Sequence, residues 1–166
     1  MGIEDGGPSV HENNPIRVFV THTYSESDDY LRIFEFLECV DRFYYLNVSK
    51  PDERPAGGMD ELKDALIEQI KAAEAVFVIP ALYDDQPDLI KFMMDAADAN
   101  GKPMIVIQSF GRVSETPKEL VERCAEHIEW NAREMVDALK RQARLEDTAR
   151  WEVVDFPGYD ADGEVS

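Results

Sequence analysis

Short apolar runs alternate along the chain with longer segments in which apolar residues recur every three or four positions. The runs are rich in β-branched and aromatic residues, which is typical of strands, whereas the longer segments have the spacing of helices that bury one face. We expect strands at residues 16–21, 43–48, 75–79, 103–107 and 127–130. We expect helices at residues 28–40, 62–73, 88–100, 117–126 and 132–143. Their alternation predicts an α/β protein whose parallel sheet is covered by helices on both faces.

The run at residues 75–79 has no polar member, as expected for a central strand that is covered on both faces. Right-handed crossovers between parallel strands leave few topologies for this order of elements. We therefore expect a five-stranded sheet in the order 2-1-3-4-5, with residues 16–21 and 75–79 as neighbouring central strands.

Two of the predicted helices begin with capping signals. Ser25 and Asp28 have the spacing of a capping box, and Ser27 competes with Ser25 as the N-cap of the first helix. Asn131, with Glu134 three residues on, has the same spacing before the last helix.

The 166 residues are enough for one domain with a sizeable core. We expect an N-terminal flexible arm over residues 1–14, which are rich in Gly, Pro, Asn and acids, and a folded domain over residues 15–145. Residues 146–166 hold seven acids and one base, which indicates an acidic tail. Its apolar residues, Trp151 and Phe156 among them, could dock on the body as a strand.

The net charge of −18, from 35 acidic and 17 basic residues, argues against polyanionic partners, because such a surface repels nucleic-acid backbones and anionic membranes. No apolar run approaches the ~20 residues of a membrane span, and the first residues lack the apolar core of a signal peptide. We therefore expect a cytoplasmic protein. Acidity of this degree suits a salt-loving organism, and equally an ordinary cytosolic protein with an acidic tail.

Metal and redox chemistry have little support in the sequence. Cys39 and Cys124 each fall within a predicted helix and share no metal-binding spacing, so we expect two buried free thiols. His22, Asp28 and Asp29 could be imagined as metal ligands, but donors at this spacing are common by chance. We assign no metal.

Ligands of open parallel sheets bind beyond the carboxyl ends of the strands, here at residues 21–27, 48–58, 80–86 and 108–114. The chain has no GxGxxG, GxxxxGK[ST] or GxSxG motif, so a Rossmann dinucleotide site, a P-loop and a nucleophile elbow have no support. From its position alone, His22 is as consistent with a binding residue as with a surface-loop histidine. We expect one cleft lined by His22, Thr23, Tyr24, Asn47, Ser49, Pro51 and Tyr83.

Three segments resemble motifs of a single protein family. Residues 18–24, VFVTHTY, are similar to a VFxSHSW/Y strand and loop, and residues 46–51, LNVSKP, resemble an xNYSxP segment. Residues 125–131, AEHIEWN, are similar to ADxIVGWN. In this order the motifs resemble the TIR-like domain family that includes the TIR proteins of the Thoeris antiphage system. The resemblance covers residues 16–144.

The resemblance implies a flavodoxin-like three-layer sandwich and a nucleotide pocket. Active members of the family consume NAD and make cyclic ADP-ribose-type signals, using a glutamate in a SxWIxxEI helix. The matching segment here, residues 88–94, has Leu89 in place of the tryptophan and Met93 in place of the glutamate. A thioether supplies no charge, so we assign no catalytic residue and expect Met93 to reach the floor of the cleft.

Two functions are consistent with these observations. The first is a signalling module without classical NAD hydrolase activity, which binds NAD or a related nucleotide, a protein partner or a second copy of itself. The alternative is an active NAD-consuming enzyme of antiviral defence, a glycohydrolase or a cyclase, that uses other acids such as Asp28, Asp84 or Asp85. A domain with a structural role only is a third reading. No cofactor is assigned.

The charge generates the first prediction. Self-repulsion at −18 should destabilise the fold at low ionic strength, and salt should relieve it by screening. The melting temperature should therefore rise between ~0.1 M and ~2 M salt, where the Debye length falls from about 10 Å to below 3 Å. A melting temperature that does not rise would contradict the salt-loving origin.

Overall fold

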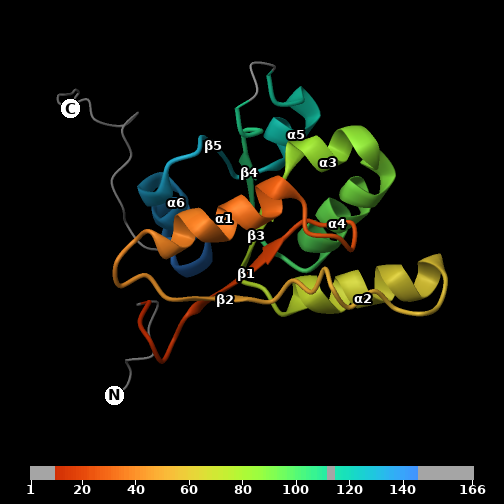
Figure 1. Ribbon diagram of the computed structural model, residues 1–166, viewed down its shortest axis with the longest axis horizontal. Helices are drawn as coiled ribbons and strands as arrows, with labels where there is room; N and C mark the ends of the chain where they lie inside the picture. Colours follow the sequence, from red (N-terminus) through yellow and green to blue (C-terminus); the bar gives the residue numbers. More distant parts are fainter. Residues whose placement is uncertain (1–9, 112–114, 146–166) are drawn as a thin grey trace.

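The computed structural model describes residues 10–111 and 115–145 (Figure 1). Most of the expected N-terminal arm, residues 1–9, and the expected acidic tail, residues 146–166, lie outside the described residues, so the predictions for them stay predictions. The elements in chain order are β1 (Ile16–Val20), α1 (Asp28–Glu38), β2 (Tyr45–Asn47), α2 (Met59–Lys71), β3 (Ala75–Val78), α3 (Pro80–Asp85), α4 (Pro87–Ala99), β4 (Met104–Ile107), α5 (Lys118–Arg123), β5 (Glu126–Ile128) and α6 (Ala132–Arg144).

The five strands are all parallel and lie in the order β2-β1-β3-β4-β5, which confirms the expected topology. With helices on both faces, the sheet forms a flavodoxin-like α/β sandwich. β1 and β3 are neighbours, and Phe19 lies opposite Val76. Every residue of β3 and β4 is buried, as their uninterrupted apolar runs predict.

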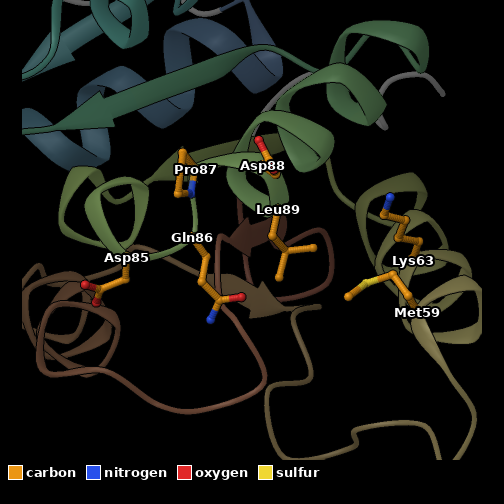
Figure 2. A pocket seen from close by; sticks show the side chains of 7 residues that line it. All are labelled: Met59, Lys63, Asp85, Gln86, Pro87, Asp88 and Leu89. Atoms are coloured by element: carbon orange, nitrogen blue, oxygen red, sulfur yellow. The ribbon is translucent and has the colours of Figure 1, made fainter.

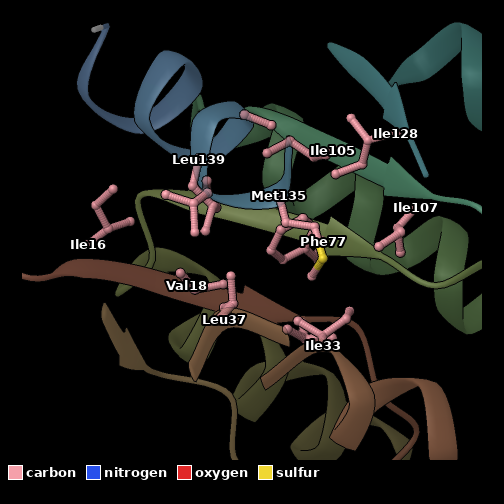
Figure 3. Close-up of a cluster of buried hydrophobic side chains, with 14 of the residues drawn as sticks. Ile16, Val18, Ile33, Leu37, Phe77, Ile105, Ile107, Ile128, Met135 and Leu139 are labelled. Atoms are coloured by element: carbon pink, nitrogen blue, oxygen red, sulfur yellow. The ribbon is translucent and has the colours of Figure 1, made fainter. Parts of the chain in front are cut away.

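Alternate side chains of the central strands enter two hydrophobic cores, one on each face of the sheet. Val18 and Phe77 belong to the core that α1 and α6 cover, and Phe19 and Val76 to the core that α2 and α4 cover. Both phenylalanines have no exposed surface. Burial of a side chain of this size contributes roughly 1.5–3 kcal/mol to the stability of the fold. Figure 3 shows the first core, to which the helices contribute Ile33, Leu37, Met135 and Leu139.

The helix starts follow the capping signals of the sequence. At α1 the competing N-cap prevails: Ser27 Oγ accepts the backbone N–H of Tyr30 at 3.2 Å. At α6 the prediction is confirmed, because Asn131 Oδ1 accepts the backbone N–H of Glu134 at 2.9 Å. No helix in the described part of the chain is both long and apolar enough to cross a membrane.

Three details differ from the sequence-based expectations. Residues 80–86, expected as a loop, contain the short helix α3, which Pro80 can begin because the first helical position needs no N–H donor. α5 ends at Arg123, where the backbone turns extended, and β5 therefore begins one residue earlier than predicted. The prediction of two buried thiols is wrong: Cys39 is exposed and Cys124 only half-buried, because each lies just past the last turn of its helix.

A buried ion pair joins the end of α6 to the turn before β3. Arg144 donates from Nε and Nη2 to the two carboxylate oxygens of Glu74, at 2.5 and 3.0 Å. Arg17 reaches the same carboxylate with its backbone N–H at 3.1 Å and with Nη1 at 3.2 Å. Burial by itself would raise the pKa of Glu74, but the hydrogen bonds and charges of the two arginines together lower it. Glu74 is therefore ionised at neutral pH and stabilises the fold there.

The second prediction concerns this ion pair. Glu74→Ala should lower the free energy of unfolding at pH 7 by about 3 kcal/mol, because it leaves the guanidinium of Arg144 buried without its carboxylate. Since the native pKa of Glu74 lies below its unfolded value, the wild type should lose this contribution as the pH falls through the acid range. Urea unfolding at several pH values measures both effects. Glu68→Ala is the control, because Glu68 forms only an exposed pair with Lys71 at 3.8 Å; an equal loss in both variants would contradict the prediction.

Candidate functional site

His22 is fully buried where the chain leaves β1. Its Nδ1 accepts the backbone N–H of Tyr24 at 3.1 Å, so the ring proton resides on Nε2, which donates to Gln69 Oε1 at 2.9 Å. Burial lowers the pKa of His22, and the hydrogen bond to Gln69 opposes this only in part. The imidazole is therefore neutral at pH 7 and holds the loop after β1 in place. The reading of His22 as a surface-loop histidine is wrong.

Gln69 connects three segments through one buried side chain. Its Oε1 accepts from His22 and also from the backbone N–H of Lys50 at 2.9 Å. Its Nε2 donates to the hydroxyl of Tyr24 at 3.1 Å. Because Gln69 lies on α2, this amide fixes the loops after β1 and β2 against the same helix.

A second hydrogen-bonded group lies beside the first. Asn47 donates from Nδ2 to the Tyr30 hydroxyl at 3.0 Å and accepts the backbone N–H of Ser49 at 2.9 Å. The Ser49 hydroxyl lies 2.9 Å from the Tyr30 hydroxyl and also donates to Asn47 Oδ1. The His22 ring stands edge-on to both tyrosines, with centroids 4.8 Å from Tyr24 and 6.3 Å from Tyr30. We name the whole set the polar cluster: His22, Tyr24, Tyr30, Asn47, Ser49 and Gln69.

The polar cluster contains four of the predicted site residues: His22, Tyr24, Asn47 and Ser49. Pro51 is buried in the loop that follows, and Thr23 is half-buried between His22 and Tyr24 in the chain. Tyr83 lies on α3, at the same end of the sheet as His22, and packs against the core under α2 and α4 as Tyr24 does. Met93 is part of that core and has no exposed surface. Its side chain therefore points away from solvent, and its expected place at the floor of the cleft stays a prediction.

The structure has a cavity of about 430 Å³ between the first turn of α2 and the junction of α3 with α4. We name it the α2–α4 cavity. It is lined by Met59, Lys63, Asp85, Gln86, Pro87, Asp88 and Leu89. Figure 2 shows Met59 and Lys63 of α2 on one side and the junction residues on the other. Its volume lies within the range of small-molecule sites.

Two further hollows lie elsewhere on the structure. One of about 480 Å³ runs between β2 and α2 and includes Asn47 and Lys50. The other, of about 240 Å³, is lined on one side by Asp28 and on the other by Phe110. Of the predicted site residues, only Asn47 lines one of these three hollows. The sequence therefore named four members of the polar cluster but not the α2–α4 cavity, and the single cleft expected for the seven residues stays a prediction.

Two signals could have extended the sequence-based assignment. Gln69 is a polar residue on the helix face that carries Leu66 and Ile70, and a polar residue in such a position needs buried partners. Leu89, on the segment that the sequence analysis compared with a catalytic helix, lines the α2–α4 cavity. Within residues 10–111 and 115–145, no group of three or more His, Cys, Asp or Glu side chains is arranged to hold a metal ion.

No protein-family model matches the chain, and no curated protein sequence matches it either. The fold defines an α/β sandwich of the flavodoxin-like class, with a polar cluster that is buried at His22, Tyr30, Ser49 and Gln69 and a small-molecule-sized cavity beyond the strands.

The third prediction concerns Gln69. Gln69→Leu leaves the buried His22 Nε2–H and the part-buried Lys50 N–H without their acceptor, so the free energy of unfolding should fall by about 2–4 kcal/mol. Denaturant unfolding measures this change. Gln86→Leu is the matched control, because the side chain of Gln86 is exposed. A loss in Gln69→Leu no larger than in the control would show that the polar cluster contributes little to stability.

Proposed function

We propose that the protein is a TIR-like signalling module that binds NAD or a related nucleotide without hydrolysing it. The observation that carries this proposal is the identity and burial of the residue at position 93. The resemblance requires a carboxylate there, and the chain has a methionine with no exposed surface. It belongs to the same apolar cluster as Phe19 and Leu66.

The absence of a carboxylate at this position removes the charge that would stabilise a developing cation as a glycosidic bond breaks. One such interaction commonly contributes a factor of ~100–1000 to the rate. Asp88 and Asp95, the nearest acids before and after position 93 on α4, are poorly placed to replace the missing carboxylate. Asp88 lies in the first turn, more than one turn away, and Asp95 is exposed and paired with Arg123 at 2.9 Å.

The α2–α4 cavity has the composition of a nucleotide pocket. Met59 and Leu89 offer apolar surface to a planar base, and the amide of Gln86 can both donate to and accept from its edge. Lys63 supplies a cation for a phosphate, and its Nζ lies 5.0 Å from the ring centroid of Phe92. The carboxylates of Asp85 and Asp88, which line the cavity, can accept hydrogen bonds from the hydroxyls of a ribose. These groups support binding of a nucleotide and supply no obvious leaving-group chemistry.

One observation favours the alternative of an NAD-consuming enzyme. Of the three acids named for that role, Asp85 lines the α2–α4 cavity, beside Asp88. Catalysis by Asp85 would predict nicotinamide release that depends on this residue and not on Met93.

The fourth prediction separates the two functions. The purified protein, incubated with NAD at ~0.1 M and ~2 M salt, should release no nicotinamide above a protein-free blank, yet calorimetry should detect NAD binding. Lys63→Ala should weaken that binding by about tenfold, the effect of one charge-assisted contact. Lys71→Ala, on the same helix and outside the cavity, should bind as the wild type does.

Each contrary outcome has a definite meaning. Nicotinamide release that Asp85→Asn abolishes and Met93→Ala leaves intact would establish the enzyme. Release that neither variant affects would overturn both assignments of residues. Neither release nor binding at either salt concentration would exclude NAD as the ligand.

A further inference from the structure

The hollow between β2 and α2 has the size of a small-molecule site. Its volume is about 480 Å³, and we name it the β2–α2 hollow. One side is formed by β2 and the turn that follows it, and the other side by one face of α2. The β2–α2 hollow shares no residue with the α2–α4 cavity, so its chemistry is independent of the proposed nucleotide site.

The two walls of the β2–α2 hollow are apolar. Leu46 and Val48 alternate with Asn47 along the chain, so their side chains share the face of the sheet that α2 covers. Opposite them, Ala65 and Ala72 lie on one face of α2, two helical turns apart. The small alanine side chains leave the space that larger residues would fill, and this space suits an aliphatic group.

A tight turn after β2 carries the charges of the β2–α2 hollow. The backbone N–H of Glu53 donates to the Lys50 carbonyl at 3.2 Å, and Pro51 between them is buried. Proline at this position of a turn fixes the backbone in advance. The Lys50 N–H in turn donates to Gln69 Oε1 at 2.9 Å, which anchors the turn to α2. The polar cluster therefore holds Lys50 and Glu53 beside the hollow.

The β2–α2 hollow has one unpaired charge of each sign. Lys50 and Glu53 both line it and are exposed, and within the described residues neither forms an ion pair, with the other or with a third residue. Glu68, which also lines the hollow, is paired with Lys71 at 3.8 Å. A ligand with only a carboxylate would be repelled by Glu53, and one with only an ammonium group by Lys50. A ligand with both groups can place each against its counter-charge.

Gln69 adds a hydrogen-bond donor at the same place. It lines the β2–α2 hollow and is only 7% exposed. One of the two Nε2 N–H groups donates to the Tyr24 hydroxyl at 3.1 Å, and the other has no hydrogen-bond partner among residues 10–111 and 115–145. A buried donor of this kind needs an acceptor, and a carboxylate bound beside Lys50 supplies one.

We propose that the β2–α2 hollow binds a free α-amino acid with an aliphatic side chain. The ammonium group lies at Glu53, the carboxylate lies between Lys50 and the second Nε2 N–H of Gln69, and the side chain contacts the apolar walls. The net charge of this ligand is zero, so the −18 charge of the protein does not oppose its approach. Each end of a peptide has only one of the two charged groups, so a peptide does not satisfy both residues of the turn.

The fifth prediction tests the three parts of this ligand by calorimetry of the full chain. L-Leucine is the probe, and each comparator lacks one part: isocaproate lacks the ammonium group, L-leucinamide the carboxylate and glycine the side chain. Each comparator should bind at least about tenfold more weakly than L-leucine, because it loses a charged contact or the apolar burial.

Variants of the turn and of α2 test the assignment of residues. Lys50→Ala should bind L-leucine about tenfold more weakly and should no longer distinguish it from L-leucinamide, an effect that loss of stability alone does not produce. Lys118→Ala, at an exposed lysine of α5, is the matched control and should bind as the wild type does. Ala65→Leu should abolish binding by filling the β2–α2 hollow, whereas Ala65→Ser should retain it.

Four results would overturn the proposal. The first is the absence of L-leucine binding up to ~10 mM ligand. The second is an equal affinity of the wild type for L-leucine and any one of the three comparators. The third is a Lys50→Ala variant that still distinguishes L-leucine from L-leucinamide, and the fourth is an Ala65→Leu variant that binds as tightly as the wild type.

Discussion

The structure depends on the burial of β3 on both faces, and of β1 everywhere but at Arg17, because this constraint excludes polar side chains from the middle of the sheet. After Arg17, polar residues next appear where β1 ends, at Thr21 and His22, and both are fully buried. Each must therefore find a partner within the protein. Thr21 Oγ1 accepts the backbone N–H of Ile79 at 3.0 Å, which ties the ends of β1 and β3 together. The hydrogen bonds of the polar cluster meet the same requirement for the buried polar groups beyond the end of the sheet.

The sequence predicted most of the fold, because its strongest signals are those that the two-sided burial imposes. The run at residues 75–79 has the uninterrupted apolar pattern of a central strand, and the right-handed rule then left few strand orders. Six-residue α3 has too few positions to show a helical period, and only the structure reveals it. Gln69 was missed because the period of α2 identifies the buried face but not the partners of a polar residue on it. The α2–α4 cavity was missed because it depends on how the side chains of α2 pack beside the junction of α3 with α4, which the helical period alone does not show.

Helix α4 packs in the core and also lines the α2–α4 cavity. Its first turn contributes Leu89 to the cavity, and one turn later Met93 and Met94 fill the core on the sheet. A flexible thioether adapts to an irregular space between helices and strands, whereas a carboxylate in the same place would need hydrogen-bonding partners. The identity of residue 93 is therefore coupled to the packing of the whole α2–α4 face.

The contact between Arg144 and Pro15 has an architectural consequence. Arg144 Nη2 donates to the Pro15 carbonyl at 2.9 Å, so the points at which the chain enters and leaves the sandwich are adjacent although 129 residues separate them in sequence. A domain whose entry and exit points are adjacent can be inserted into a surface loop of another protein without forcing the two ends of that loop apart. Joining these two points by a short linker and opening the chain elsewhere would likewise preserve every strand pairing. The sandwich is thus suited to modular rearrangement, as a unit that other chains can carry.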